Sequence, residues 1–163
     1  MSTLREKRPA SDKPSQAAGA SEYDHDFFAW TQAQAESLRR GAWSLLDIEN
    51  LVDEVESLGK SQKREIRSRL IILLQHLLKW QFQPDQRSSS WRGTIVEQRG
   101  ELNDELRDSP SLRPYVATCL PKQYATARLK AAGETGLAES TFPEECPFTI
   151  DQVLDEGFFP AIA

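Results

Sequence analysis

A histidine and a stripe of carboxylates are the residues of this chain whose types and spacing could do chemistry. Glu49, Asp53 and Glu56 recur at helical spacing, and His76 follows in the most apolar stretch of the chain. Carboxylates that face an imidazole could bind a divalent metal ion, as in the cores of di-metal helical bundles. The imidazole could also act as a general base, because its ordinary pKa lies close to neutral pH. His76, Glu49 and Glu56 are therefore the candidate catalytic residues.

The rest of the sequence does not complete such a centre. Di-metal bundles use two Glu-x-x-His pairs, whereas the only such pair here is Glu22–His25, and the chain contains just two histidines. No Gly-x-Ser-x-Gly sequence, phosphate-binding loop or Cys–His signature accompanies His76. A lone histidine on an apolar helix is more often a hydrogen-bonded core residue. We therefore expect no bound metal and no cofactor, and a metal-binding or hydrolytic bundle centred on His76 stays an alternative.

Positive charge is concentrated in the middle of the chain, between two acidic flanks. Residues 60–100 contain nine Lys or Arg against three Asp or Glu. The preferred interpretation is internal: an acidic helix over residues 47–58 pairs with the basic helix that follows it. The alternative is an exposed basic face that binds an anionic partner. The candidate residues for that face are Lys60, Lys63, Arg64, Arg67, Arg87 and Arg92.

Aromatic side chains lie among these cations and suggest a nucleic-acid alternative. Trp80, Phe82 and Trp91 could stack on unpaired bases between arginines. The same side chains also fit apolar helix faces, where large aromatic residues usually lie. The net charge of −5 and the pI of 5.1 argue against general binding to phosphate backbones. Nucleic-acid binding by residues 60–99 is a second alternative that we do not favour.

The composition is that of a small globular protein. Its 163 residues predict one domain, and 39% hydrophobic residues are enough for a core. Cys119 and Cys146 are typical of reduced thiols in a cytosolic protein rather than of a disulfide framework. The longest apolar run, residues 70–78, is too short to span a bilayer, which takes about 20 residues. We expect a cytoplasmic protein without a membrane segment.

The first 20 residues differ from the rest of the chain. They are charged, contain proline and alanine, and have almost no large apolar side chain. Such a segment buries too little surface to offset the entropy of ordering it. We predict a disordered tail over residues 1–20 and a single helical domain over residues 21–163.

The spacing of apolar residues predicts helices throughout that domain. Gly41 and Gly59 are expected to end the first two helices, and residues 70–78 are apolar on both faces, which is typical of an enclosed helix. The fold class is therefore all-α: a bundle of five to six helices, mostly up-down, around one central apolar helix. One face of the second helix, predicted to pack on a neighbour, carries Ile48, Leu51, Val52, Val55 and Leu58. The helices are expected over about residues 24–40, 47–58, 61–82, 88–106, 109–136 and 149–154.

Five short motifs spread along the chain carry a family resemblance. They are Tyr23-Asp24-x-Asp26-Phe27-Phe28-Ala29-Trp30-Thr31, Glu54-x-Glu56-Ser57-Leu58-Gly59, His76-Leu77-Leu78-Lys79-Trp80-Gln81-x-Gln83-Pro84, Ser109-Pro110-Ser111-Leu112 and Pro143-Glu144-x-Cys146-Pro147. In this order they resemble a bacterial family catalogued as domain of unknown function twenty-nine, over roughly residues 23–160. The resemblance implies an all-helical fold and supplies no activity, cofactor or catalytic residue.

The lack of a catalytic motif makes a small interaction or adaptor module, without catalytic activity, the preferred function. Such a module acts through an unidentified protein partner, and self-association into a homodimer is the simplest case.

Overall fold

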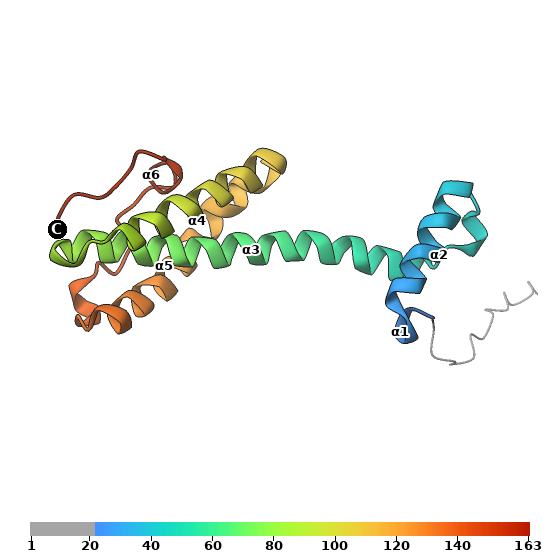
Figure 1. The fold of residues 1–163 in the computed structure, drawn as a ribbon, viewed down its shortest axis with the longest axis horizontal. Helices are drawn as coiled ribbons and strands as arrows, with labels where there is room; N and C mark the ends of the chain where they lie inside the picture. The colour runs from blue at the N-terminus through green and yellow to red at the C-terminus, as the bar shows by residue number, and fades with distance from the viewer. Residues whose placement is uncertain (1–21) are drawn as a thin grey trace, which may run out of the picture. The chain divides into compact units, whose positions relative to one another are not determined.

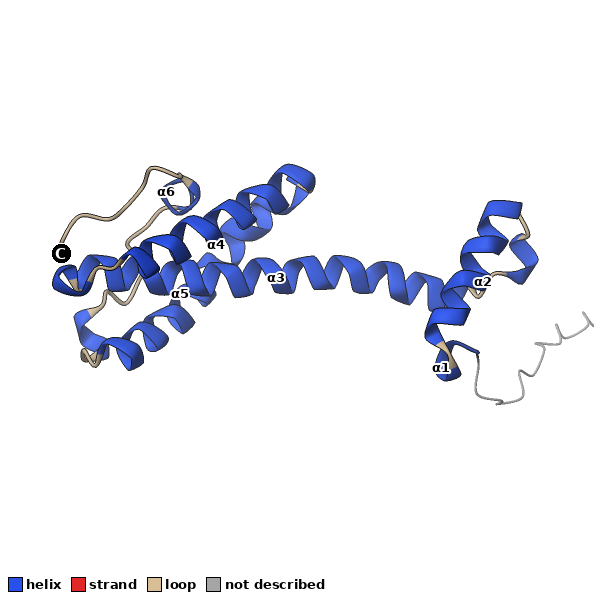
Figure 2. Cartoon of the chain, in the orientation of Figure 1, coloured by secondary structure: helices blue, strands red, loops and turns tan. Residues whose placement is uncertain are grey.

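The computed structural model describes residues 22–163, and all regular secondary structure in that range is helical. Six α-helices are joined by short 3-10 turns and loops (Figures 1 and 2). The predicted all-α fold is thereby confirmed. The tail predicted over residues 1–20 lies outside the described residues.

The chain divides into two compact units, one ending at Asp53 and the other running from Glu54 to Ala163. The division falls within helix α3, which runs without interruption over Ile48–Phe82. A single domain over residues 21–163 stays a prediction, and each unit is described by itself. Within residues 22–163, no helix combines the length and apolar character needed to cross a membrane.

The first unit contains the short helix α1 (Glu22–His25), the helix α2 (Phe27–Arg40) and a 3-10 turn at Trp43–Leu45. The side chain of Asp26 accepts a hydrogen bond from an amide of the first turn of α2 at 2.9 Å. Gly41 ends α2 in the left-handed conformation, with φ of 66°, which a residue with a Cβ rarely adopts. The predicted end at Gly41 is confirmed, whereas the predicted start near residue 24 is wrong, because α1 is a separate helix and α2 starts at Phe27.

Two buried residues of α2 hold the start of α3. Trp30 donates its indole Nε1–H to Oδ2 of Asp47 at 3.2 Å. The Oε1 of Gln34 accepts a hydrogen bond from the backbone amide of Asp47 at 2.8 Å. Asp47 in turn accepts hydrogen bonds from Asn50, and these hydrogen bonds lower the pKa of the Asp47 carboxyl. Asp47 therefore caps α3 while it is fixed to α2.

The continuity of α3 shows that the predicted break at Gly59 is wrong. The helix contains 35 residues, and Gly59 lies inside it with a negative φ. Glycine costs a helix about 1 kcal/mol relative to alanine, a penalty that the helix-forming residues on either side can offset. Glu56 and Lys60 also form an ion pair of 2.9 Å on the two sides of the glycine. Two predicted helices are therefore one.

The second unit packs the later part of α3 against three further helices. These are α4 (Ser89–Asp108), α5 (Arg113–Thr135) and α6 (Ile150–Leu154), and α4 and α5 lie alongside α3 (Figure 1). The core of this unit is formed by leucines and other apolar side chains with little or no exposure. Its largest fully buried apolar members are Ile66, Leu70, Leu73, Leu74, Leu77, Leu78, Ile95, Leu102, Val116, Tyr124 and Phe142.

The ends of these helices follow the local sequence. The Oγ of Ser88 accepts a hydrogen bond from the backbone amide of Trp91 at 3.2 Å and so caps the start of α4. Gly136 ends α5 with φ of 70°. Thr149 and Gln152 form the predicted capping box at the start of α6. These residues act locally, through the unpaired amides and carbonyls that every helix end exposes.

A buried arginine fixes the last residues of the chain to the bundle. Arg99 of α4 is 1% exposed. Its guanidinium donates hydrogen bonds to the backbone carbonyls of Val153 at 2.8 Å, Phe158 at 2.9 Å and Glu156 at 3.4 Å. The charge is thus removed from water, but each of the three guanidinium nitrogens has a carbonyl acceptor, which is the condition for burying it.

Candidate functional site

Four of the six predicted partner-binding cations lie together on α3. At about 100° per residue, Lys60, Lys63, Arg64 and Arg67 share one side of the helix, and all four are exposed. We call these four residues the basic face of α3. Lys60 pairs with Glu56, and Nζ of Lys63 lies 5.1 Å from the centre of the Tyr115 ring. Arg64 and Arg67 form no hydrogen bond or ion pair with the residues that the structure describes.

The predicted pairing of an acidic helix with a basic helix is wrong. Because α3 is continuous, the acidic segment cannot fold back on the basic one, and only neighbours one turn apart can meet. The Glu56–Lys60 pair is such a contact. Within the part of the chain that the structure describes, the basic face is therefore exposed to solvent.

The other two predicted cations lie away from the basic face. Arg87 follows α3 and donates its Nε–H to the carbonyl of Trp80 at 2.8 Å, with its guanidinium 4.8 Å from the centre of that ring. The guanidinium of Arg92, on α4, lies 5.8 Å from the centre of the Phe159 ring. Arg67 and Trp80 are 13 residues apart in one helix, which is about 20 Å. The six candidates are thus divided between two places.

The aromatic residues near these cations pack on the protein itself. The Trp80 ring lies 5.1 Å from that of Phe159, and the Phe82 ring lies 5.1 Å from that of Phe142. Both Trp80 and Phe82 rest against the core. Trp91 lies over the ammonium group of Lys79. Their contacts are those of packed helix faces.

An apolar stripe on α3 is exposed, although its spacing predicted a packed face. Ile48, Val52, Val55 and Leu58 have exposed fractions of 58, 50, 67 and 69%, and Leu51 is half-buried. We call these five residues the α3 stripe. At 100° per residue, the centre of the stripe lies about 130° around the helix from the centre of the basic face. The periodicity of the sequence predicts an amphipathic helix, but it does not show whether another element covers the apolar face of that helix.

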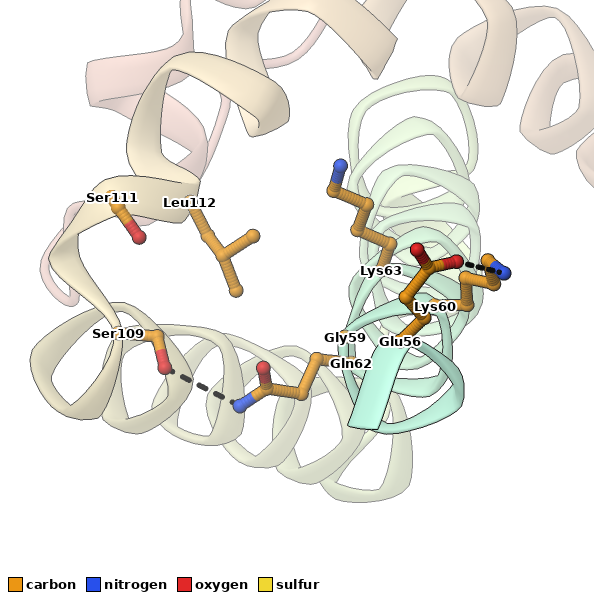
Figure 3. A pocket seen from close by; sticks show the side chains of 8 residues that line it. All are labelled: Glu56, Gly59, Lys60, Gln62, Lys63, Ser109, Ser111 and Leu112. Atoms are coloured by element: carbon orange, nitrogen blue, oxygen red, sulfur yellow. Dashed lines mark hydrogen bonds and ion pairs between the residues drawn. The ribbon is translucent and has the colours of Figure 1, made fainter. Parts of the chain in front are cut away.

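Two hollows flank α3 where it leaves the bundle of the second unit. Gln62 lines both, and its Nε2 donates a hydrogen bond to Oγ of Ser109 at 3.3 Å. The second hollow, of about 600 Å³, lies towards Leu58 and Glu105. The first, of about 320 Å³, is shown in Figure 3 and is lined by Glu56, Gly59, Lys60, Gln62, Lys63, Ser109, Ser111 and Leu112.

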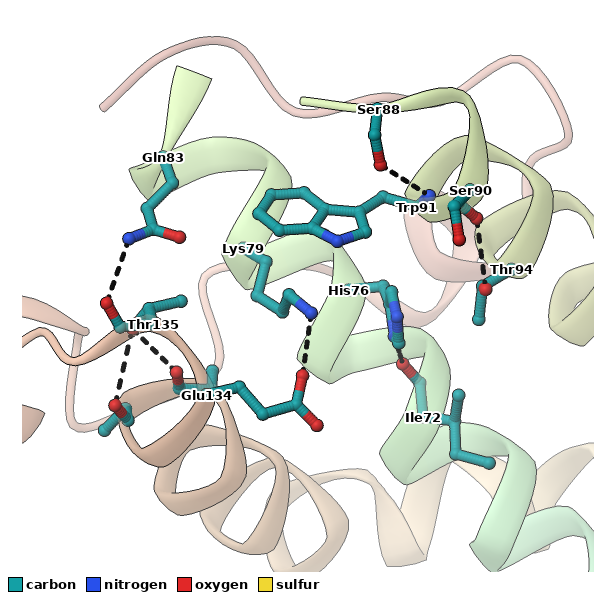
Figure 4. A network of polar contacts seen from close by, with 12 residues as sticks. Ile72, His76, Lys79, Gln83, Ser88, Ser90, Trp91, Thr94, Glu134 and Thr135 are labelled. Atoms are coloured by element: carbon teal, nitrogen blue, oxygen red, sulfur yellow. Dashed lines mark hydrogen bonds and ion pairs between the residues drawn. The ribbon is translucent and has the colours of Figure 1, made fainter. Parts of the chain in front are cut away.

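His76 lies in a polar network on the other half of α3 (Figure 4). Its Nδ1 is 2.9 Å from the carbonyl of Ile72, so Nδ1–H donates and Nε2 is left as the acceptor. Burial lowers the pKa of the His76 imidazole, the hydrogen bond to Ile72 opposes that shift, and the positive charge of Lys79 adds to it. The neutral imidazole is therefore favoured, as expected for a hydrogen-bonded histidine at the edge of a core.

Lys79 joins α3 to α5 in the same network. Its Nζ donates to Oε2 of Glu134 at 2.7 Å and lies 4.4 Å from the centre of the Trp91 ring. The hydrogen bond from Lys79 lowers the pKa of the Glu134 carboxyl. Sequence analysis did not pair Lys79 with Glu134, because they are 55 positions apart and only the packing of two helices brings them together.

The structure does not bring the three candidate catalytic residues together. Glu56 precedes His76 by 20 residues in one helix, a separation of about 30 Å, and Glu49 lies a further two turns towards the start of that helix. Within residues 22–163, no three His, Cys, Asp or Glu side chains are grouped so that they could hold a metal ion. A carboxylate stripe facing His76 is therefore not formed.

Both cysteines are free thiols. Burial raises the pKa of the thiols of Cys119 and Cys146, which disfavours the nucleophilic thiolate. Cys146 lines a hollow of about 400 Å³ together with Tyr124. Burial also raises the pKa of Tyr124 to about 12, and its hydroxyl donates to the carbonyl of Pro143 at 2.7 Å. These groups hold a loop against α5.

The fold and its exposed surfaces define an all-helical protein whose distinctive features lie on one long helix. The chain belongs to the family described as Domain of unknown function DUF29, whose model matches residues 22–159. The resemblance drawn from the five motifs is thereby confirmed. No curated protein and no solved structure matches the chain.

Proposed function

We propose that the protein is a helical interaction module, without catalytic activity or cofactor, that binds a protein partner through α3. The observation that carries this proposal is the exposure of Val55 and Leu58, each by about two-thirds, on a helix whose later residues form the core. A cytoplasmic location, consistent with two free thiols, is part of the proposal.

Burial of the α3 stripe by a partner supplies the driving force for binding. Removing apolar surface from water contributes about 25 cal/mol per Å², and exposed apolar patches on a helix commonly mark interaction sites. Since α3 is anchored in the bundle by core leucines such as Leu70 and Leu73, little ordering entropy opposes the contact. The stripe is therefore suited to bind the apolar face of another helix.

The basic face of α3 favours a partner that carries negative charge. Arg64 and Arg67 have no ion pair among the described residues, so carboxylates of a partner would increase the association rate without displacing internal contacts. Carboxylates beside the apolar face of a partner would be attracted by the basic face as the partner approaches the stripe. Raised ionic strength should weaken such binding, because screening acts on exposed charges.

Site-specific photocross-linking tests this proposal. A photoreactive phenylalanine analogue replaces Leu58 in the full-length chain, expressed in its native cell, and the matched control carries the analogue at Leu129. Leu129 is a comparable side chain, 57% exposed, on α5. We expect a discrete adduct at position 58 and none at position 129. An adduct at neither position, or the same adduct at both, would contradict a partner site on α3.

A nucleic-acid partner is an outcome that the same protein can reveal. Binding of DNA or RNA by the basic face would give retention on nucleic-acid resin that falls steeply with salt. Replacement of Arg64 and Arg67 by glutamine should abolish that retention while the cross-link at position 58 is kept. Such a result would assign a nucleic acid to the basic face of α3, beside the protein partner on the stripe.

A further inference from the structure

We propose that an acidic segment of the protein partner lies along the contact between α3 and α5, beside Lys63 and Arg67 of α3 and Lys122 of α5. This inference rests on the proposed function and adds to it the chemistry of the partner and a second helix. All the residues involved belong to the second unit. We call the surface formed by Lys63, Arg64, Arg67, Tyr115 and Lys122 the basic seam.

Helices α3 and α5 run side by side in the same direction. Nζ of Lys63 lies over the Tyr115 ring, and further along both helices Lys79 donates to Glu134 (Figure 4). The two contacts follow the same order in each helix, so the helices are parallel between them. On α3 the two contacts are 16 residues apart, which is about 24 Å. An extended segment of a partner can therefore follow the two helices over this length.

Lys122 continues a row of residues that Tyr115 begins on α5. Tyr115, Cys119 and Lys122 are separated by four and three positions, so they share one side of the helix. Burial raises the pKa of the Cys119 thiol, and the charge of Arg67 opposes that shift, which places Arg67 near Cys119. Lys122 is exposed and lies about 5 Å further along α5 than Cys119. The cations of the two helices therefore line one surface, in the order Lys63, Arg67 and Lys122.

The positive charge of the basic seam is not neutralised within the part of the chain that the structure describes. Residues 113–133 of α5 contain no Asp or Glu, and residues 57–82 of α3 contain only Glu65. Glu65 pairs with Arg69, which also pairs with Glu101 of α4 and so lies on another side of α3. The exposed cations of the seam that form no ion pair with a described residue are Lys63, Arg64, Arg67 and Lys122. Like charges held close together repel, so an anion that binds among them relieves this repulsion.

The surroundings of the basic seam favour an acidic protein segment over a nucleic acid. Proteins bind single-stranded nucleic acids through aromatic rings that stack on bases, whereas Tyr115 is half-buried under the ammonium group of Lys63. The neighbouring helix α4 exposes Glu97, Glu101 and Asp104, which would repel a polyanion that extends beyond the seam. At ~3.3 Å per residue, about seven extended residues cover the length of the seam. A short acidic segment therefore matches both its length and its charge.

Fluorescence anisotropy with the purified full-length protein tests the basic seam. The probes are fluorescein-labelled octaglutamate and, as the nucleic-acid arm, fluorescein-labelled octathymidylate, at ~20 mM salt, where screening is weak. We expect octaglutamate to bind and added salt to release it. The double variant Arg67→Gln/Lys122→Gln should bind octaglutamate roughly tenfold more weakly, because two exposed ion pairs are lost. Circular dichroism checks the helical fold, and Arg64→Gln/Lys122→Gln replaces the double variant if that variant has lost it.

Arg107→Gln/Arg113→Gln is the matched control. It removes two exposed cations that lie outside the basic seam and pair with Asp104 and Asp151, so it changes the net charge equally and should leave the affinity unchanged. Equal losses of affinity in the two double variants, or no binding of octaglutamate at all, would overturn the seam as the site. Octathymidylate that binds more tightly than octaglutamate, and that Arg67→Gln/Lys122→Gln releases, would assign the seam to a nucleic acid and overturn the acidic segment.

The photocross-link at position 58 separates this inference from the function on which it rests. In the variant Arg67→Gln/Lys122→Gln, the yield of that adduct should fall, because the partner has lost the contacts of its acidic segment. An undiminished adduct would overturn the acidic segment and leave the interaction module standing. Absence of the adduct from the unsubstituted protein, with octaglutamate binding still lost in the double variant, would refute a partner on the stripe and leave the basic seam as a site for acidic segments.

Discussion

Arg99 holds the last residues of the chain through three hydrogen bonds to backbone carbonyls. We expect Arg99→Ala to lower the free energy of unfolding by about 3–5 kcal/mol, because one buried and two partly buried carbonyls lose their donor at once. Urea denaturation of the variant measures the loss. Arg107→Ala is the control, since Arg107 is exposed and pairs with Asp104 one turn away, and such pairs contribute at most ~1 kcal/mol. Equal losses for both variants would show that Arg99 does not hold this segment.

The spacing of residues in the chain could not reveal the role of Arg99. Its carbonyl acceptors lie more than 50 positions further along the chain, and backbone oxygens have no side-chain signature. In sequence, Arg99 was one of nine cations in a basic segment. His76 was easier to interpret, because a single histidine within an apolar run points to a hydrogen-bonded core position. The chemistry of a residue is visible in sequence only when its partners are close in the chain.

His76 should make the protein less stable in mild acid. Burial lowers the pKa of the folded imidazole, so below about pH 6.5 the unfolded chain binds a proton that the folded chain resists. Stability is therefore expected to fall as the pH drops from about 6.5 through the lower, folded pKa. The variant His76→Gln should stay folded and lose less stability over this window than the original protein. Identical pH dependence of the two proteins, measured by urea denaturation, would contradict a neutral buried histidine.

Helix ends depend on glycine only where the backbone is left-handed. Gly41 has φ of +66°, whereas Gly59 lies inside α3, and a Cβ added to it would meet nothing within 4 Å. We expect Gly59→Ala to stabilise the protein by about 0.5–1 kcal/mol, because alanine is the better helix former. Gly41→Ala should destabilise it. Thermal denaturation compares the two, and a destabilised Gly59→Ala variant would indicate a hinge at this position.

The two glycines explain which helix ends could be predicted from the sequence. Gly41 follows two arginines and precedes a segment without helical periodicity, and these features together were sufficient to predict the end of the helix. Gly59 follows an apolar face that ends at Leu58, which suggested a stop. The Glu56–Lys60 pair and the helix formers around it outweigh that suggestion. Because residues 47–58 and the basic segment belong to one helix, the expected pairing between them does not form. The missed continuity at Gly59 therefore also changed the prediction for the basic face, which is exposed.

At the scale of the whole molecule, the hydrophobic core of residues 22–163 lies in the second unit. Every buried residue of the main hydrophobic cluster lies between Ile66 and Leu154, whereas the first unit buries only Trp30 and Gln34 in α2. The all-α class and the family were predictable from periodicity and motifs. The exposure of the α3 stripe was not, because an amphipathic pattern shows that a face can be buried and does not show what buries it.

The distribution of the core leads to an expectation for the fragment Glu54–Ala163. Since this unit contains the whole cluster and the Arg99 contacts, it should remain helical and unfold cooperatively without residues 1–53. Circular dichroism with thermal denaturation of the fragment checks this expectation. A fragment that lacks a cooperative transition would show that residues 1–53 are needed to stabilise the bundle.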